Sequence, residues 1–210
     1  MTDKMQRKLD NGREYRSMTL EVRAAGNDGE MIVEGYATTF AQAYVLYEAK
    51  GYKVLEQVDP HAFDECDMND VIFQYDHEGR VFARTRNKTL ELSVDSKGLL
   101  IRADLSGTDE GRKLYQEIAG GYTDRMSFGF VVAEDKREYV TDNDAGTETC
   151  TRTITKISKL YDVSAVSIPA NDMTSISARK FSDGVIAELE AERLRQEKRK
   201  KLKLLLEVTA

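Results

Sequence analysis

The segment that decides the fold is residues 124–130, which read Asp124-Arg125-Met126-Ser127-Phe128-Gly129-Phe130. Because side chains alternate between the two faces of a strand, Met126, Phe128 and Phe130 would form an apolar stripe, with Ser127 and Gly129 on the opposite face. Such a stripe predicts a strand that packs on a core. Glycine inside a strand commonly marks a place where another group approaches the backbone closely. A substrate or a catalytic base would fit beside Ser127, and so would an ordinary packing partner.

Alternating and apolar runs on both sides of this segment predict further strands. The expected strands cover residues 17–24, 31–40, 70–76, 89–94, 99–105, 124–134 and 149–168. One helix is expected between them, because Thr108 can cap its first turn and Gly120-Gly121 would end it. The pattern predicts a mainly β fold of the α+β kind, built as a closed or nearly closed antiparallel barrel with flanking helices.

The chain divides into three zones. Residues 1–15 are polar and predict a flexible N-terminus, residues 16–180 hold the β domain, and residues 181–210 form a charge-dense helical tail. No apolar residue occurs in residues 195–201 of the tail, so a continuous heptad seam is missing. The tail is either a solvated helix outside the domain or a docking segment that can be removed.

Composition excludes several classes of protein. The 210 residues contain 31 Lys+Arg and 37 Asp+Glu, for a net charge of −6, which argues against a broad basic face for nucleic acid. We find no apolar run long enough for a membrane span and no secretory signal in the polar N-terminus. Two cysteines, Cys66 and Cys150, match neither a disulfide framework nor a metal site. We therefore expect a reducing cytosolic setting, no metal and no cofactor.

Only two histidines, His61 and His77, are present for any histidine-dependent chemistry. His77 follows an apolar strand and precedes a glycine turn, so it could reach a cleft from a rigid element, or it could be a half-exposed turn residue. Asp162 begins a small and apolar run, where it would be a strand-end charge or the orienting partner of a buried base. His61 lies in a turn. The residues alone therefore leave a His/Ser/Asp site and an ordinary β domain as alternatives.

The order of several short motifs resembles a known family. These motifs are Val33-Glu34-Gly35-Tyr36-Ala37, Asp59-Pro60-His61-Ala62-Phe63, Asp76-His77-Glu78, Met126-Ser127-Phe128-Gly129-Phe130 and Asp162-Val163-Ser164-Ala165-Val166 followed by Pro169-Ala170. The set is similar to the prohead (procapsid maturation) serine proteases of tailed bacteriophages, whose fold resembles that of herpesvirus assemblins. The resemblance covers roughly residues 16–180.

This resemblance implies a serine endopeptidase that works inside the immature phage shell in the host cytoplasm. Such enzymes cut the scaffolding protein, or the scaffold segment of the major capsid protein, and themselves. The family's catalytic base corresponds to His77, its nucleophile to Ser127 and its third member to Asp162. Assemblins use a second histidine as the third member, so His61 is the outside alternative, although the family more often has glycine at that position.

The resemblance also names partners. Capsid and scaffolding proteins would be the substrates, a homodimer is allowed, and neither a membrane nor a specific nucleic acid is expected. The tail at residues 181–210 would help incorporate the protease into the prohead and would be removed by self-cleavage. Two alternatives remain: a non-enzymatic, capsid-associated structural β domain, and a ligand-binding β-barrel without chemistry.

Overall fold

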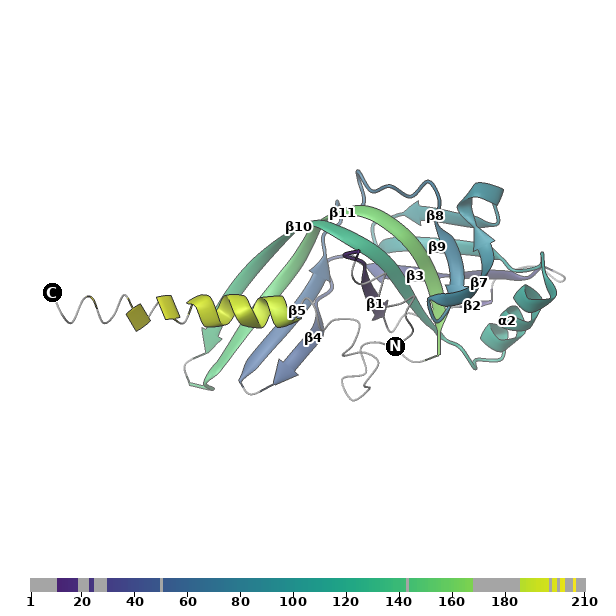
Figure 1. Ribbon diagram of the computed structural model, residues 1–210. Helices are drawn as coiled ribbons and strands as arrows, with labels where there is room; N and C mark the ends of the chain where they lie inside the picture. Colours follow the sequence, from purple (N-terminus) through teal and green to yellow (C-terminus); the bar gives the residue numbers. More distant parts are fainter. Residues whose placement is uncertain are drawn as a thin grey trace.

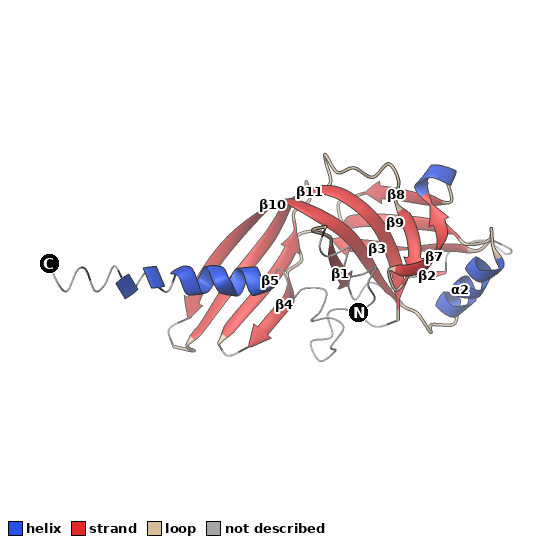
Figure 2. Ribbon diagram, viewed as in Figure 1, coloured by secondary structure: helices blue, strands red, loops and turns tan. Residues whose placement is uncertain are grey.

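The computed structural model describes residues 11–18, 23–24, 30–49, 51–142, 144–167, 186–196, 198–199, 201–202 and 206. In this part of the chain, strands dominate and form two sheets, with helices at the two ends of the molecule (Figures 1 and 2). The larger sheet contains β1 (Glu14–Met18), β10 (Arg125–Asp142), β11 (Thr147–Val166), β5 (Tyr52–Val58), β4 (Tyr44–Ala49), β6 (Ile72–Tyr75) and β7 (Glu78–Arg84). The smaller sheet contains β2 (Arg23–Ala24), β3 (Ile32–Thr39), β9 (Gly98–Asp104) and β8 (Leu90–Val94).

The long hairpin of β10 and β11 organises the larger sheet. These two strands pair with each other along almost their whole length. At one end β11 pairs in parallel with β6, and at the other end it pairs in parallel with β5. Figure 1 shows the hairpin arching from one half of the molecule to the other. We call the half formed by β4, β5 and the facing parts of β10 and β11 the extension.

The main core lies between the two sheets. Met126, Phe128 and Phe130 are all fully buried, so the apolar stripe of the opening segment is confirmed, and the rings of Phe128 and Phe130 stack with centroids 4.3 Å apart. Leu114 and Ile118 of α2 (Asp109–Ala119) join this core. The burial of this stripe fixes which face of β10 carries Ser127.

Several local predictions are confirmed. The Thr108 side chain accepts a hydrogen bond from the Gly111 amide at 3.0 Å and caps α2, which stops at Gly120. The hairpin of β8 and β9 forms around Asp95, whose Oδ1 accepts from the Gly98 amide at 2.9 Å. A short 3-10 helix, η1 (Thr85–Asn87), links β7 to β8.

The closed antiparallel barrel is not found: the described strands make two sheets, and β11 has parallel neighbours. The expected strand at 17–24 is also different, because β1 begins at Glu14 and pairs in the larger sheet, whereas β2 pairs in the smaller one. Residues 19–22 lie outside the described part. The mainly β class is correct because strand periodicity is local, but the pairing partners are set by distant contacts.

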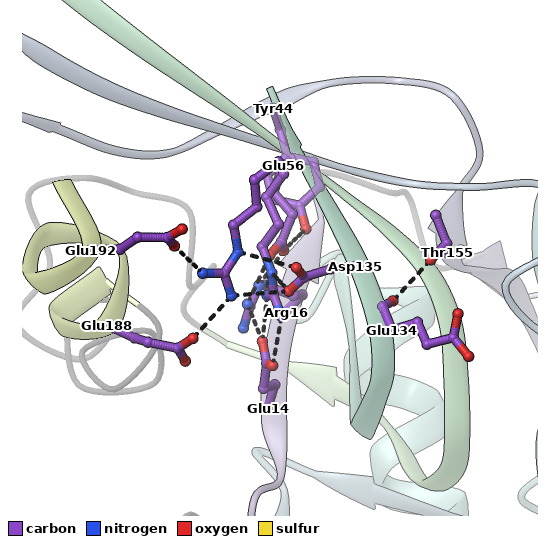
Figure 3. Close-up of polar contacts among 11 residues, drawn as sticks. Glu14, Arg16, Tyr44, Glu56, Glu134, Asp135, Thr155, Glu188 and Glu192 are labelled. Carbon is purple, nitrogen blue, oxygen red and sulfur yellow. Dashed lines mark hydrogen bonds and ion pairs between the residues drawn. The ribbon is translucent and has the colours of Figure 1, made fainter. Parts of the chain in front are cut away.

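A helix over residues 186–196 packs on the extension. Leu189 is fully buried there against Tyr52, Val54 and Cys150. Arg137 of β10 pairs with two glutamates of this helix, Glu188 at 3.0 Å and Glu192 at 2.6 Å (Figure 3). These described turns are therefore docked on the sheet by Leu189 and by ion pairs, which include those of Arg137 and that of Arg193 with Glu148 at 2.8 Å.

Of the expected flexible N-terminus at residues 1–15, residues 1–10 lie outside the described part, whereas Glu14 and Tyr15 belong to β1. Residues 168–185, which span the expected boundary between the β domain and the tail, also lie outside the described part. No helix in the described ranges is long and apolar enough to cross a membrane.

Candidate active site

His77 is carried by a tight turn between β6 and β7. Tyr75 and Glu78 pair across this turn, and its two central residues, Asp76 and His77, have φ angles of +48° and +59°. Two-residue hairpin turns commonly have positive φ at both central positions, and aspartate and histidine tolerate this region better than most residues. The strand ends at Tyr75, one residue before the expected end at Asp76, and His77 lies in the turn that follows.

The turn is fastened to the end of β11 by Asp76. Its amide donates to the Ala165 carbonyl at 3.0 Å, and its carboxylate accepts from the amide and hydroxyl of Ser167 at 3.0 and 2.9 Å. A turn held at three points has little freedom to rotate. The His77 ring is therefore fixed over the face of the sheet that carries Ser127.

Three of the predicted residues come together on this face. His77 Nε2 lies 2.5 Å from the Ser127 hydroxyl of β10, and His77 Nδ1 is hydrogen-bonded to an Asp162 carboxylate oxygen of β11. Ser127 is opposite Ser164 in the β10–β11 ladder, and Asp162 is opposite Gly129. All three residues are at most 3% exposed, so water is excluded from both hydrogen bonds.

This arrangement matches the chemistry of an activated serine. A serine hydroxyl is a weak nucleophile unless a base accepts its proton, and a neutral imidazole can do so at Nε2. A carboxylate at Nδ1 selects the tautomer with a free Nε2 lone pair and stabilises the imidazolium that forms. The geometry can therefore activate Ser127 for attack on an acyl group.

Gly129 makes room for the carboxylate. A Cβ on this residue would lie 2.5 Å from Asp162 Oδ2 and 2.6 Å from the Tyr15 ring. The close approach that a strand glycine implies is therefore made by the acid and by an aromatic ring of β1, not by the base or a substrate.

Two contacts of the His77 ring come from residues that sequence reasoning missed. The Tyr15 ring of β1 lies edge-on at a centroid distance of 4.5 Å. Burial and the nearby Asp162 charge raise the pKa of Tyr15, so its phenol stays protonated at neutral pH. The Ser164 hydroxyl lies 3.2 Å from His77 Nδ1 and 3.3 Å from Asp162 Oδ1. Ser164 could have been noticed, because it lies two residues after Asp162 on the same strand face. Tyr15 gave no signal, since it belongs to a polar N-terminal run.

His61 lies apart from these residues. Its side chain is 81% exposed, its Nδ1 is 3.0 Å from Asp64 Oδ2, and its amide bonds to Asp59. Within the described residues, its hydrogen bonds stay inside this turn, so the geometry favours Asp162 as the partner of His77. No group of three or more metal-ligating side chains was found among the residues that the structure describes.

Comparison with known proteins gives two matches. Residues 18–185 match the family model described as caudovirus prohead serine protease. The chain is also 27% identical over 169 residues to the prohead protease of Enterobacteria phage HK97, which covers 79% of this chain and 67% of the relative. No solved structure shows significant similarity to the chain.

Proposed function

This chain belongs to the caudovirus prohead serine protease family and is a serine endopeptidase of capsid maturation, and we propose that it cleaves the scaffolding protein, or the scaffold segment of the major capsid protein, inside the prohead. Family membership argues against the two non-enzymatic alternatives. The observation that carries the proposal is the contact of both His77 ring nitrogens, one with Ser127 and one with Asp162.

Ser127 is the nucleophile in this proposal. Its oxygen bonds to the scissile carbonyl carbon while its proton passes to His77 Nε2, and Asp162 stabilises the resulting imidazolium. The C–N bond then breaks, and His77 returns the proton to the leaving amine. A water molecule, deprotonated by His77, then attacks the acyl carbon, and the ester bond to Ser127 breaks as His77 returns the proton to the serine oxygen. Backbone donors for the oxyanion would each supply about 3–4 kcal/mol, as in studied proteases.

Co-expression with the phage's capsid and scaffolding proteins tests this function. We expect the wild type to shorten one of them and Ser127→Ala to leave both at full length. Ser158→Ala is the matched control, because Ser158 is an exposed serine that donates to the Val131 carbonyl at 3.2 Å on the same hairpin. Processing by Ser127→Ala at the wild-type rate would refute the assignment.

The domain organisation is part of the same proposal. Residues 181–210 would bring the protease into the prohead and would then be removed by self-cleavage. The ionic contacts of Arg137 with Glu188 and Glu192 support a tail that starts docked. Intact mass spectrometry of the wild type should show loss of the tail, which Ser127→Ala should retain.

Deletion of residues 182–210 tests the incorporation role, and normal packaging of the shortened protein into shells would contradict it. The homodimer that the family resemblance allows gains no support from the comparisons, and it stays a prediction.

A further inference from the structure

Ser127 is covered in this structure. Its exposed fraction is 0%, although the proposed reaction requires its oxygen to touch the carbonyl carbon of a separate chain. The neighbouring His77 and Asp162 are covered as well, at 3% and 1%. Some group must therefore leave before a substrate can reach the hydroxyl.

The main chain in contact with the hydroxyl belongs to β1. This strand pairs antiparallel with β10, and Ser17 is directly opposite Ser127 in the ladder. The Ser127 hydroxyl donates to the Arg16 carbonyl oxygen at 2.9 Å. One residue earlier, the Tyr15 ring lies against His77. β1 therefore covers both the nucleophile and the base.

The contact with Arg16 is a hydrogen bond and not an attack geometry. The hydroxyl meets the oxygen end of the Arg16 carbonyl as a donor, whereas a scissile carbonyl must present its carbon to Ser127 and its oxygen to separate donors. The Arg16 carbonyl also competes with His77 Nε2 for the single hydroxyl proton. β1 thus fills the position beside Ser127 without being a substrate there.

We propose that β1 is a resident strand that occupies the site of the substrate's main chain along β10, and that it must detach before Ser127 can attack an extended peptide. The proposal rests on the function proposed above and names the binding mode of that site. When β1 leaves, the edge of β10 offers unpaired backbone donors and acceptors beside the nucleophile. An extended peptide can satisfy these groups by strand addition.

Glu14 and Arg16 hold β1 in place from the face of the strand opposite Tyr15 (Figure 3). Arg16 is 1% exposed and donates to both carboxylate oxygens of the fully buried Glu56, at 2.5 and 3.0 Å. Glu14 accepts from Arg152 at 2.8 and 3.0 Å and from Arg16 at 2.5 Å. Burial alone would lower the pKa of Arg16, but the charges of Glu56 and Glu14 raise it, so the guanidinium is ionised at neutral pH. We call Glu14, Arg16, Glu56 and Arg152 the clamp.

β1 is therefore held by two independent sets of contacts. Its main chain and Tyr15 lie on the catalytic residues, while its charged side chains are anchored elsewhere in the sheet. A change to the anchor can therefore release the strand without altering the residues that perform the chemistry. Glu14→Gln is the mildest such change, because it keeps the side-chain shape and removes the charge that binds Arg16 and Arg152.

The test measures covalent labelling of Ser127 by a small fluorophosphonate, followed by mass spectrometry. We expect Glu14→Gln to label about tenfold faster than the wild type. Asp70→Asn is the matched control, because Asp70 also binds an arginine, Arg84, through two contacts of 2.6 Å, but does not touch β1. Equal rates for Glu14→Gln and wild type, or an equal rise in Asp70→Asn, would overturn the proposal.

A reversible disulfide tests the same proposal by comparing the oxidised and reduced forms of one protein. Met18 and Met126 are directly opposite in the β1–β10 ladder, so cysteines at both positions can be bridged. With the disulfide formed, we expect labelling of Ser127 to fall to background, and dithiothreitol should restore it in the same sample. Equal labelling of the oxidised and reduced forms would show that β1 does not have to leave.

Different results would contradict the role of β1 and the role of Ser127. If Ser127 labels and its loss abolishes processing, but the disulfide has no effect, only the resident-strand proposal is wrong. If Ser127→Ala still processes substrate, the proposed nucleophile is wrong, and with it the role of β1.

Discussion

Asp162 faces Gly129 across the β10–β11 ladder, and its carboxylate fills the space that a side chain on residue 129 would need. A Cβ at this position would lie 2.5 Å from Asp162 Oδ2. The orientation of the acid, and through it of the His77 ring, therefore depends on the absence of a single methyl group.

Gly129→Ala is expected to lower the rate of substrate cleavage at least about 100-fold, because displacement of a catalytic group by about 1 Å can cost that much. The folded state should also lose about 1–3 kcal/mol of stability, as for overpacking in general. Cleavage rate and thermal unfolding are measured together. Gly107→Ala is the control, since a Cβ there meets nothing within 4 Å. Full activity in Gly129→Ala would mean that Asp162 does not need this position.

The third member of the site is tested by paired substitutions. Asp162→Asn should reduce turnover by about 10⁴-fold, the scale seen when a triad aspartate is neutralised. His61→Ala should change turnover by less than about twofold, because its exposed side chain contacts Asp64 and lies in a separate turn. The measurement is the cleavage rate of purified substrate. A larger loss from His61→Ala would favour a second histidine.

Acid should weaken the fold through Glu56. Burial alone would raise the pKa of this carboxyl group, but Arg16 and Arg152 lower it from 4.5 to about 2. A carboxyl group whose pKa is lowered by folding stabilises the folded state at pH values above its pKa in the unfolded chain. This stabilisation is lost as the pH falls from 4.5 towards 2. Urea unfolding at several pH values measures it. Glu56→Gln should be less stable at pH 7 and should show a shallower acid dependence, and an unchanged dependence would contradict this role.

The reaction rate of the Cys150 thiol reports whether the helix over residues 186–196 is docked. Cys150 is fully buried beneath Leu189, and burial raises the pKa of its thiol, so it should react slowly with thiol reagents. Leu189→Ala should speed modification of Cys150 at least about tenfold, as mapped by mass spectrometry. Leu194→Ala, at a 57% exposed position of the same helix, should have no effect. Equal rates in all three proteins would mean that the helix does not protect the thiol.

Local patterns predicted much of the fold and singled out His77, Ser127 and Asp162 as candidates, whereas their catalytic roles came from the resemblance to the prohead proteases. The stripe at Met126, Phe128 and Phe130 gave the orientation of β10, and therefore the face of Ser127. Thr108 gave the start of α2. His77 was placed at the end of an apolar strand, although its turn has positive φ, which alternation cannot reveal. These signals are local because strand faces and helix caps depend on near neighbours.

The role of β1 could not be predicted from the same kind of signal. Glu14 and Arg16 belong to a polar run that is typical of a flexible terminus, and their partners Glu56 and Arg152 lie 40 or more residues away. Buried ion pairs have no periodicity, and each charged residue in isolation suggests a surface position. For the same reason β4 and β5 were missed, because Glu56 interrupts the apolar pattern of β5 while being fully buried.

The role of Ser127 as nucleophile is measured most directly by comparing the number of fluorophosphonate adducts on Ser127 with the residual cleavage of the capsid or scaffolding substrate. We expect one adduct on the peptide that contains Ser127, loss of cleavage in proportion to labelling, and no adduct in His77→Ala. Full cleavage by protein whose Ser127 is completely labelled would contradict it, as would an adduct on a different residue that alone accounts for the loss.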